Sequence, residues 1–134
     1  PVKLSGTILI SINGNFNGKQ MESNKLFDKD ELLKKFDGDE GFLGELIEVL
    51  INDVPEQLSG IQKAVDSRNS NDIERAAHKL KGAIANFEEK AAFEAALQLE
   101  LMGRESRLDG VEEAYNTLVK EVECLVNALK EFVE

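Results

Sequence analysis

The chain has 134 residues and a formal net charge of -10, a size that suits one folded domain with a single modest core. The acidic balance argues against general nucleic-acid binding, which requires clustered Lys and Arg. The sequence has no run of about 18 apolar residues that would predict a membrane span, and no secretory signal. With one cysteine, Cys124, no internal disulfide can form, and we expect a cytoplasmic protein without membrane contact.

Residues 1–25 differ in character from the rest of the chain. They are rich in Gly and Asn and show little helical periodicity. The stretch 7–12, followed by the turn-forming pair Asn13-Gly14, fits either a short hairpin or a linker. The chain begins with Pro1 rather than methionine, which we interpret as the start of a piece of a longer protein. We therefore expect a linker-like or hairpin segment over 1–25 and one domain over 26–134.

From residue 26 onward the apolar residues follow a helical period. We expect a short helix that begins near Asp28, its N-cap, and ends at the Asp37-Gly38 pair. A second helical segment begins at Asp39 and contains Pro55, so it is either one long kinked helix or two helices with Pro55 at the start of the second. Its continuous apolar stripe favours the single kinked helix. The residues of this stripe are Leu43, Ile47, Leu50, Val54, Leu58, Ile61 and Val65.

Three further helices follow, joined by short loops. We expect a helix over 72–87, for which Asn71 and Glu74 form a variant capping box. Another helix covers 89–103, and the last runs from Val111 with apolar residues at alternating steps of four and three, as in the seam of an antiparallel bundle. The predicted fold is therefore all-α, an antiparallel up-down four-helix bundle with a short additional N-terminal helix.

The single histidine, His78, lies on the outer face of the helix over 72–87. Each residue of an α-helix advances the direction of the side chain by about 100°, which places His78 about 140° from Ile73 and toward solvent. The apolar stripe of this helix consists of Ile73, Ala77, Leu80, Ile84 and Phe87, with Ala76 near its edge. Such an exposed imidazole has a ring nitrogen that another protein can reach.

Two neighbours of His78 suit a ring that carries a phosphoryl group. Gly82 lies four residues later on the same face, and a glycine inside a helix costs about 1 kcal/mol relative to alanine. One explanation for a glycine here is that the absence of a side chain leaves the imidazole open to an approaching protein. Lys81 can place an ammonium group beside the strongly negative phosphoryl oxygens. These neighbours favour a phosphocarrier over the alternative that a lone exposed histidine has no function.

The run Ala76-Ala77-His78-Lys79-Leu80-Lys81-Gly82 resembles the signature of histidine phosphotransfer (Hpt) domains of two-component phosphorelays. Asn86 and the pair Leu99-Glu100 stand where this family often has the same residues, and the run 36–132 fits the length of its fold. The chain departs from the family in two places. Ala83 and Ile84 replace common serines, and Glu88-Glu89 replaces a common Gly-Ala pair.

The resemblance implies a mechanism and a class of partner. A response-regulator receiver domain that carries a phospho-aspartate docks over His78, and Nε2 of the imidazole attacks the phosphorus in line. The phosphoryl group then passes to a second receiver. Under this interpretation the chain is a monomeric phosphocarrier without autonomous catalytic activity, either separate from or covalently linked to histidine kinase domains. It binds no cofactor itself, because Mg²⁺ belongs to the receiver.

The resemblance also implies a set of site residues around His78, the phosphoacceptor. Lys81 steadies the phosphoryl group and Gly82 gives access to the ring. Further cations that stabilise phosphate are Arg75 and Lys79, and the residues expected to dock the receiver are Glu74, Ala85 and Asn86.

Other classes of function stay open as alternatives. A di-iron bundle needs paired Glu-x-x-His motifs, which one histidine does not supply, so we expect no metal. A hydrolase would need a nucleophile near His78, whereas Cys124 lies at the flank of the last helix's stripe and is expected to be packed. A plain interaction bundle would take up no phosphoryl group. The remaining Asp and Glu residues are expected to be solvated and to pair with Lys at helical spacing.

Overall fold

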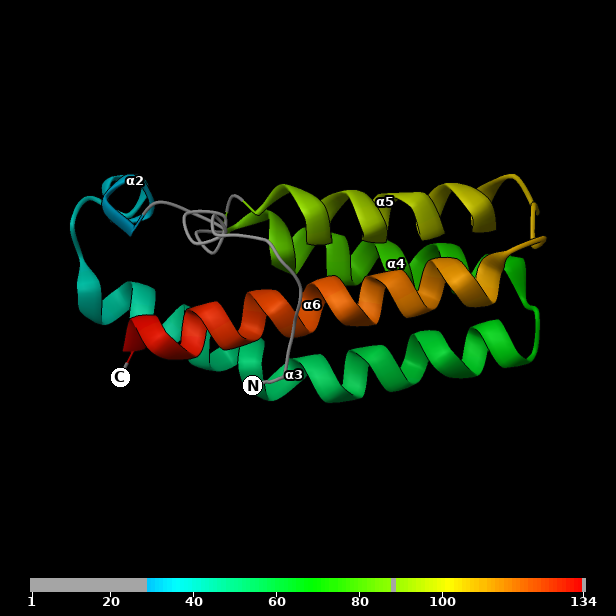
Figure 1. The fold of residues 1–134 in the computed structure, drawn as a ribbon, viewed down its shortest axis with the longest axis horizontal. Helices are drawn as coiled ribbons and strands as arrows, with labels where there is room; N and C mark the ends of the chain where they lie inside the picture. The colour runs from blue at the N-terminus through cyan, green and yellow to red at the C-terminus, as the bar shows by residue number, and fades with distance from the viewer. Residues whose placement is uncertain (1–28, 88, 134) are drawn as a thin grey trace, which may run out of the picture.

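A computed structural model describes residues 29–87 and 89–133, and these residues form helices and no strand (Figure 1). The short helix α2 spans Lys29–Lys35. The four long helices are α3 (Glu40–Asp66), α4 (Ser70–Ala85), α5 (Lys90–Arg104) and α6 (Val111–Val133). Both α4 and α6 pack against α3 and α5, and short connections reverse the chain between consecutive helices. The predicted all-α antiparallel bundle is therefore confirmed, whereas the expected hairpin or linker over 1–25 lies outside the described residues.

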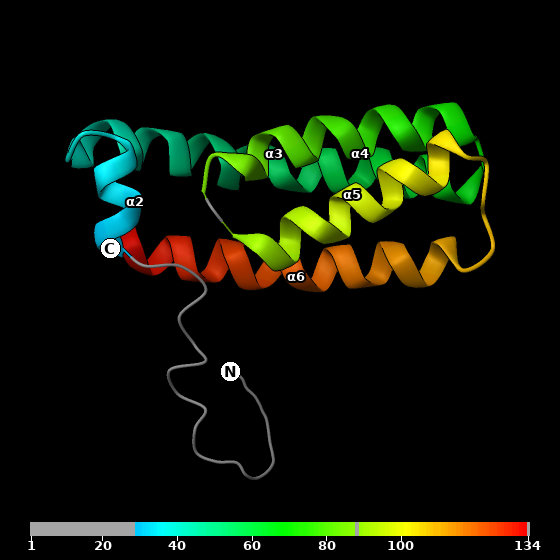
Figure 2. The ribbon, with the colours of Figure 1, turned by 90° about the horizontal axis from the view of Figure 1, so that it is seen from above.

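Helix α2 lies across one end of the bundle, where α3 begins and α6 ends (Figure 2). Leu32 is buried, and the ring of Phe36 contacts that of Phe42 with 5.8 Å between the centroids. After α2 the chain turns through two residues with positive φ, Asp37 at 56° and Gly38 at 76°. This turn confirms the predicted break. The expected cap, Asp28, lies outside the described residues.

Helix α3 runs through Pro55 as one helix, as its apolar stripe predicted. Asp39 caps it, because its side chain accepts a hydrogen bond from the backbone N–H of Phe42 at 2.9 Å. Every residue of the predicted stripe is buried except Leu58, which is half-buried. Pro55 itself is exposed, so its ring occupies the solvent side and leaves the packed face of the helix intact.

The predicted bounds of α4 were wrong at both ends. The N-cap is Asn69 rather than Asn71, and its side chain accepts from the N–H of Asp72 at 3.1 Å. A positive φ of 53° at Arg68 turns the chain quickly enough for the helix to begin at Ser70. At the other end α4 stops at Ala85, two residues earlier than the expected 87.

Helix α5 begins after a buried cap. Glu89 adopts an extended backbone as the N-cap of α5, and its buried carboxylate accepts from the N–H groups of Ala91 and Ala92. Since an extended residue cannot belong to a continuous helix, α4 and α5 are separate helices. Among the residues that the structure describes, Glu89 is also one of two glutamates that are buried instead of solvated, contrary to expectation.

The apolar seam of α6 was predicted correctly from Val111 to Leu129. Its regularly spaced apolar residues are buried, from Val111 at the start to Leu129 near the end. Cys124, however, is exposed and free, so the expectation of a packed cysteine was wrong. In the described part of the chain no helix combines the length and the apolar character that a membrane span requires.

Helices α4 and α5 are in close backbone contact at Gly103. A Cβ atom at this position would lie 2.6 Å from the backbone nitrogen of Glu74 and 2.7 Å from the carbonyl oxygen of Ser70. These distances are shorter than any van der Waals contact, so only glycine fits there. The contact brings the last turn of α5 directly against the first two turns of α4, which end just before His78.

Candidate functional site

His78 projects from the middle of α4, and its side chain is 66% exposed. The neighbouring Ala77 and Leu80 are completely buried, and Ala76 is half-buried. This pattern confirms the helical-wheel prediction that the imidazole points away from the apolar stripe. The backbone of α4 is anchored by its buried face, so the ring is presented at a defined position on the surface.

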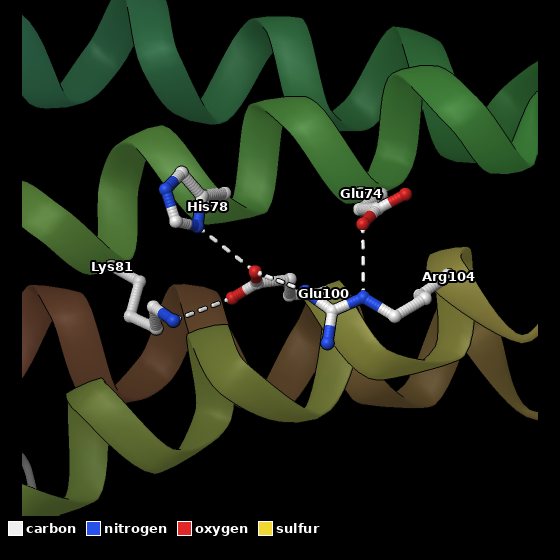
Figure 3. A network of polar contacts seen from close by, with 5 residues as sticks. All are labelled: Glu74, His78, Lys81, Glu100 and Arg104. Carbon is white, nitrogen blue, oxygen red and sulfur yellow. Dashed lines mark hydrogen bonds and ion pairs between the residues drawn. The ribbon is translucent and has the colours of Figure 1, made fainter.

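A buried carboxylate from α5 holds the inner nitrogen of this ring. The side chain of Glu100 is only 3% exposed, and its Oε2 lies 2.9 Å from Nδ1 of His78 (Figure 3). An ionised carboxylate can only accept hydrogen bonds, so this contact favours the form of the ring in which Nδ1 carries the proton, and in the neutral ring of that form the lone pair is on Nε2. In Figure 3, Nε2 points away from Glu100. The nitrogen that is free to react is therefore the outward one.

Two cations contact the carboxylate of Glu100 (Figure 3). Nζ of Lys81 lies 2.8 Å from Oε1, and Nη2 of Arg104 lies 2.9 Å from Oε2. The guanidinium also reaches back to α4, where its Nε lies 3.0 Å from a carboxylate oxygen of Glu74. These charged residues form a cluster of Glu74, His78, Lys81, Glu100 and Arg104, which we call the Glu100 cluster.

The pKa of Glu100 reflects a competition within this cluster. Burial raises the pKa, but the hydrogen bonds and charges of Lys81 and His78 outweigh it and bring the pKa below its ordinary value. The carboxylate is thus ionised at neutral pH despite its burial. The hydrogen bond to Glu74 raises the pKa of Arg104 above its already high value, so this guanidinium stays charged.

Sequence reasoning missed the role of Glu100, because acidic residues were expected to be solvated. A signal was nevertheless present in α5. The apolar or small residues Ala92, Ala96 and Gly103 are buried, and Glu100 lies four residues after the second and three before the third. A charged residue in line with such a stripe is expected to be buried, and a buried charge requires partners.

Gly82 is exposed, and a Cβ atom built on it would meet no atom within 4 Å in the described part of the chain. Packing within the domain therefore does not require a glycine at this position. Lys81, by contrast, is largely covered, with a side chain 20% exposed and Nζ 5.8 Å from the ring centroid of Phe93. In this state its ammonium group is directed at Glu100.

The other predicted site residues lie around the cluster rather than in it. Arg75 and Lys79 are exposed on α4, and Lys79 borders a groove shared with α3 on the side of Lys63 and Gly60. Ala85 and Asn86 are exposed at the end of α4. Glu74 is the exception, because it belongs to the cluster through its ion pair with Arg104, and its expected contact with a partner stays a prediction. Within the described residues no group of His, Cys, Asp and Glu side chains could hold a metal ion.

Comparison with known protein families places this site in context. A family model described as Hpt domain matches residues 45–132, which is more than half of the chain and includes both His78 and Glu100. A search of curated proteins gives no match to the chain.

Proposed function

Since the chain belongs to the Hpt domain family, whose members carry phosphoryl groups on a histidine in two-component phosphorelays, we propose that His78 is its phosphoacceptor. One observation carries this assignment: His78 is the only histidine in the sequence, and it lies within the matched region. Hpt domains are phosphocarriers rather than autonomous enzymes, and they interact with receiver domains. The exposure of the ring supports the assignment, because a receiver must reach it.

The proposed reaction begins with the neutral imidazole, whose Nδ1–H donates to Glu100. The lone pair of Nε2 attacks the phosphorus of the receiver's aspartyl phosphate. A P–N bond forms, the P–O bond to the aspartate breaks, and the aspartate leaves as a carboxylate. The Nδ1 proton stays in place, so the phosphorylated ring is cationic and faces the anionic Glu100. Transfer to a second receiver is the reverse of these steps.

Glu100 is thus proposed to control the reactivity of Nε2 through its hydrogen bond with Nδ1 on the opposite side of the ring. By accepting from Nδ1–H it selects the tautomer whose outer nitrogen is nucleophilic. It also fixes the orientation of the ring, which matters because in-line phosphoryl transfer depends on alignment. A fixed carboxylate beside the ring stabilises the positive charge that develops there during attack.

The residues around His78 have proposed roles in accommodating the phosphoryl group and the partner. Lys81 neutralises the phosphoryl oxygens, and Gly82 leaves space for the receiver above the ring. Arg75 and Lys79 supply further positive charge. The proposed docking surface extends over Ala85 and Asn86, with Glu74 at the other end of the same face.

The partners and surroundings of the domain are also proposed. The receiver is expected to hold the Mg²⁺ that phosphoryl transfer uses, and the chain itself to act as a monomer over residues 26–134. A free, exposed Cys124 supports a reducing cytoplasm as its location. Linkage to histidine kinase domains in a longer protein fits a linker-like role for residues 1–25.

The assignment is tested with a receiver domain phosphorylated by radiolabelled acetyl phosphate. We expect the chain to take up label that is labile in acid and stable in base, as a phosphoramidate is. The matched variant, His78→Gln, should keep its helical circular dichroism and take up none. Label that persists in His78→Gln would identify another acceptor, and a folded chain that takes no label from several receivers would indicate an interaction bundle.

A further inference from the structure

The carboxylate of Glu100 has two cations that come from different helices. Lys81 belongs to α4, as His78 does, and contacts Oε1 at 2.8 Å. Arg104 belongs to α5, four residues after Glu100 and therefore on the same helix face, and contacts Oε2 at 2.9 Å. Neither contact duplicates the other, because each cation occupies a different oxygen.

Phosphorylation of His78 places a second anion within reach of Lys81. The phosphoryl group adds up to about two negative charges next to a lysine that is already paired with Glu100. Lys81 follows His78 by three residues on the same helix, and its four-carbon stem is flexible enough to turn toward the ring. If it were the sole lysine or arginine on Glu100, its departure would leave the buried carboxylate with the phosphorylated imidazolium as its one remaining cation, and the loss of a partner from a buried charge is unfavourable.

We propose that Arg104 is a positioning residue that keeps Glu100 paired while Lys81 leaves it for the phosphoryl group on His78. This inference rests on the proposed function, and it identifies the residue that allows Lys81 to pair first with Glu100 and then with the phosphoryl group. Glu100 then stays anionic opposite the ring at the stage when the ring is cationic.

The geometry of Arg104 suits this role. Its guanidinium is held from both sides, by Glu100 through Nη2 and by Glu74 through Nε at 3.0 Å. Glu74 lies on α4 one turn before His78, so the guanidinium links the two helices at the site. The side chain of Arg104 is 53% exposed, and its contacts with Glu100 and Glu74 do not involve the outward face of the imidazole. It can therefore remain in place while Lys81 moves.

The exchange is observed directly by NMR of the lysine ammonium groups in ¹⁵N-labelled protein. The wild-type chain is compared before and after loading with potassium phosphoramidate, a small phosphoryl donor. We expect the Nζ resonance of Lys81, assigned with Lys81→Arg, to shift on phosphorylation in the wild type. In Arg104→Gln we expect it to stay near its unphosphorylated position, because Lys81 is retained by Glu100.

The same variants are compared for the lifetime of the phosphorylated form. Arg104→Gln should shorten the half-life of phosphohistidine about three- to tenfold, the range expected for one charge-assisted hydrogen bond at a partly exposed site. Arg104→Lys retains a cation for Glu100 and should restore most of the wild-type half-life. The control is Arg68→Gln, since Arg68 is similarly exposed, 48% against 53%, and forms an ion pair with Glu112 outside the Glu100 cluster.

The outcomes separate this inference from the proposed function. If wild-type His78 takes no label, the function fails and the inference fails with it. If His78 is labelled but the Lys81 resonance does not move, the inference alone is overturned. It is also overturned if Arg104→Gln and Arg68→Gln have the same half-life, or if Arg104→Lys is as impaired as Arg104→Gln, since packing rather than charge would then be responsible.

Discussion

The substitution Glu100→Gln tests how far the reactivity of His78 depends on a carboxylate from another helix. Glutamine has nearly the same shape, but it carries no charge, and its amide can donate as well as accept. The wild-type carboxylate accepts from Nδ1 at 2.9 Å in a position that is 3% exposed. In the variant the amide group can donate to Nδ1 instead, which selects the tautomer whose proton lies on Nε2 and blocks attack.

The size of the effect follows from this single contact. A buried hydrogen bond to a charged group contributes about 1.5–3 kcal/mol and one between neutral groups about 0.5–1.5 kcal/mol. The difference of about 1–1.5 kcal/mol corresponds to a roughly five- to thirteenfold slower transfer from the receiver. Partial occupation of the unreactive tautomer would slow transfer further.

Two measurements check this prediction. Rapid-quench kinetics with a phosphorylated receiver give the transfer rate, and ¹⁵N NMR of the ring gives the tautomer of His78. The control is Glu89→Gln, which neutralises another buried glutamate of the described residues but changes a helix cap instead of a contact with His78. Transfer within twofold of the wild type, together with an unchanged tautomer in Glu100→Gln, would refute the positioning role of Glu100.

Three further predictions concern access, packing and pH. Gly82→Gln should slow phosphoryl transfer strongly, and Gly82→Ala should have an intermediate effect. The free energy of unfolding in urea should stay equal or rise by up to about 1 kcal/mol, since the position is open and glycine is a poor helix former. Equal transfer rates in the wild type and both variants would contradict the proposal that Gly82 gives the receiver access to the ring. Gly103→Ala should lower the free energy of unfolding by about 1–3 kcal/mol, because its Cβ would lie 2.6 Å from the backbone of Glu74. An unchanged urea midpoint would show that α4 and α5 can move apart without loss of stability. The pKa of Glu100 is lower in the folded protein than its ordinary value of 4.5, so the unfolded chain takes up the proton first as the pH falls. The ionised carboxylate therefore stabilises the fold fully above pH 4.5, and this stabilisation is lost as the pH falls through the lowered pKa of the folded state. Urea unfolding between pH 6 and pH 3 should therefore show a shallower loss of stability in Glu100→Gln than in the wild type, and parallel curves would exclude this carboxylate as a source of the acid sensitivity.

The interhelical contacts at Glu100 also explain why the exposed histidine differs from an ordinary surface residue. A solvated imidazole in a helix exchanges between tautomers and rotamers, whereas this ring is tied at Nδ1 to a buried carboxylate. Glu100 is in turn neutralised by Lys81 and Arg104. The reactive nitrogen therefore faces solvent while its orientation is set from inside the bundle.

Apolar periodicity along the chain determined the helices and the direction of His78. Both are local properties: the step of about 100° per residue relates each side chain to its own helix, so the buried Leu80 and the exposed His78 could be placed without a partner helix. The break at Gly38 and the passage of α3 through Pro55 were predictable for the same reason. The resemblance around His78 then indicated the function, which the family match confirmed.

The tertiary structure alone decided what faces the inner side of the ring. Glu100 is 22 residues from His78 in sequence, and its contact depends on the register between α4 and α5, which the period of neither helix specifies. That register is set where Gly103 meets the backbone of α4, a constraint that exists only once the two helices are packed. The sequence by itself thus determined that the imidazole is exposed, and the packing of two helices decided which of its nitrogens faces solvent.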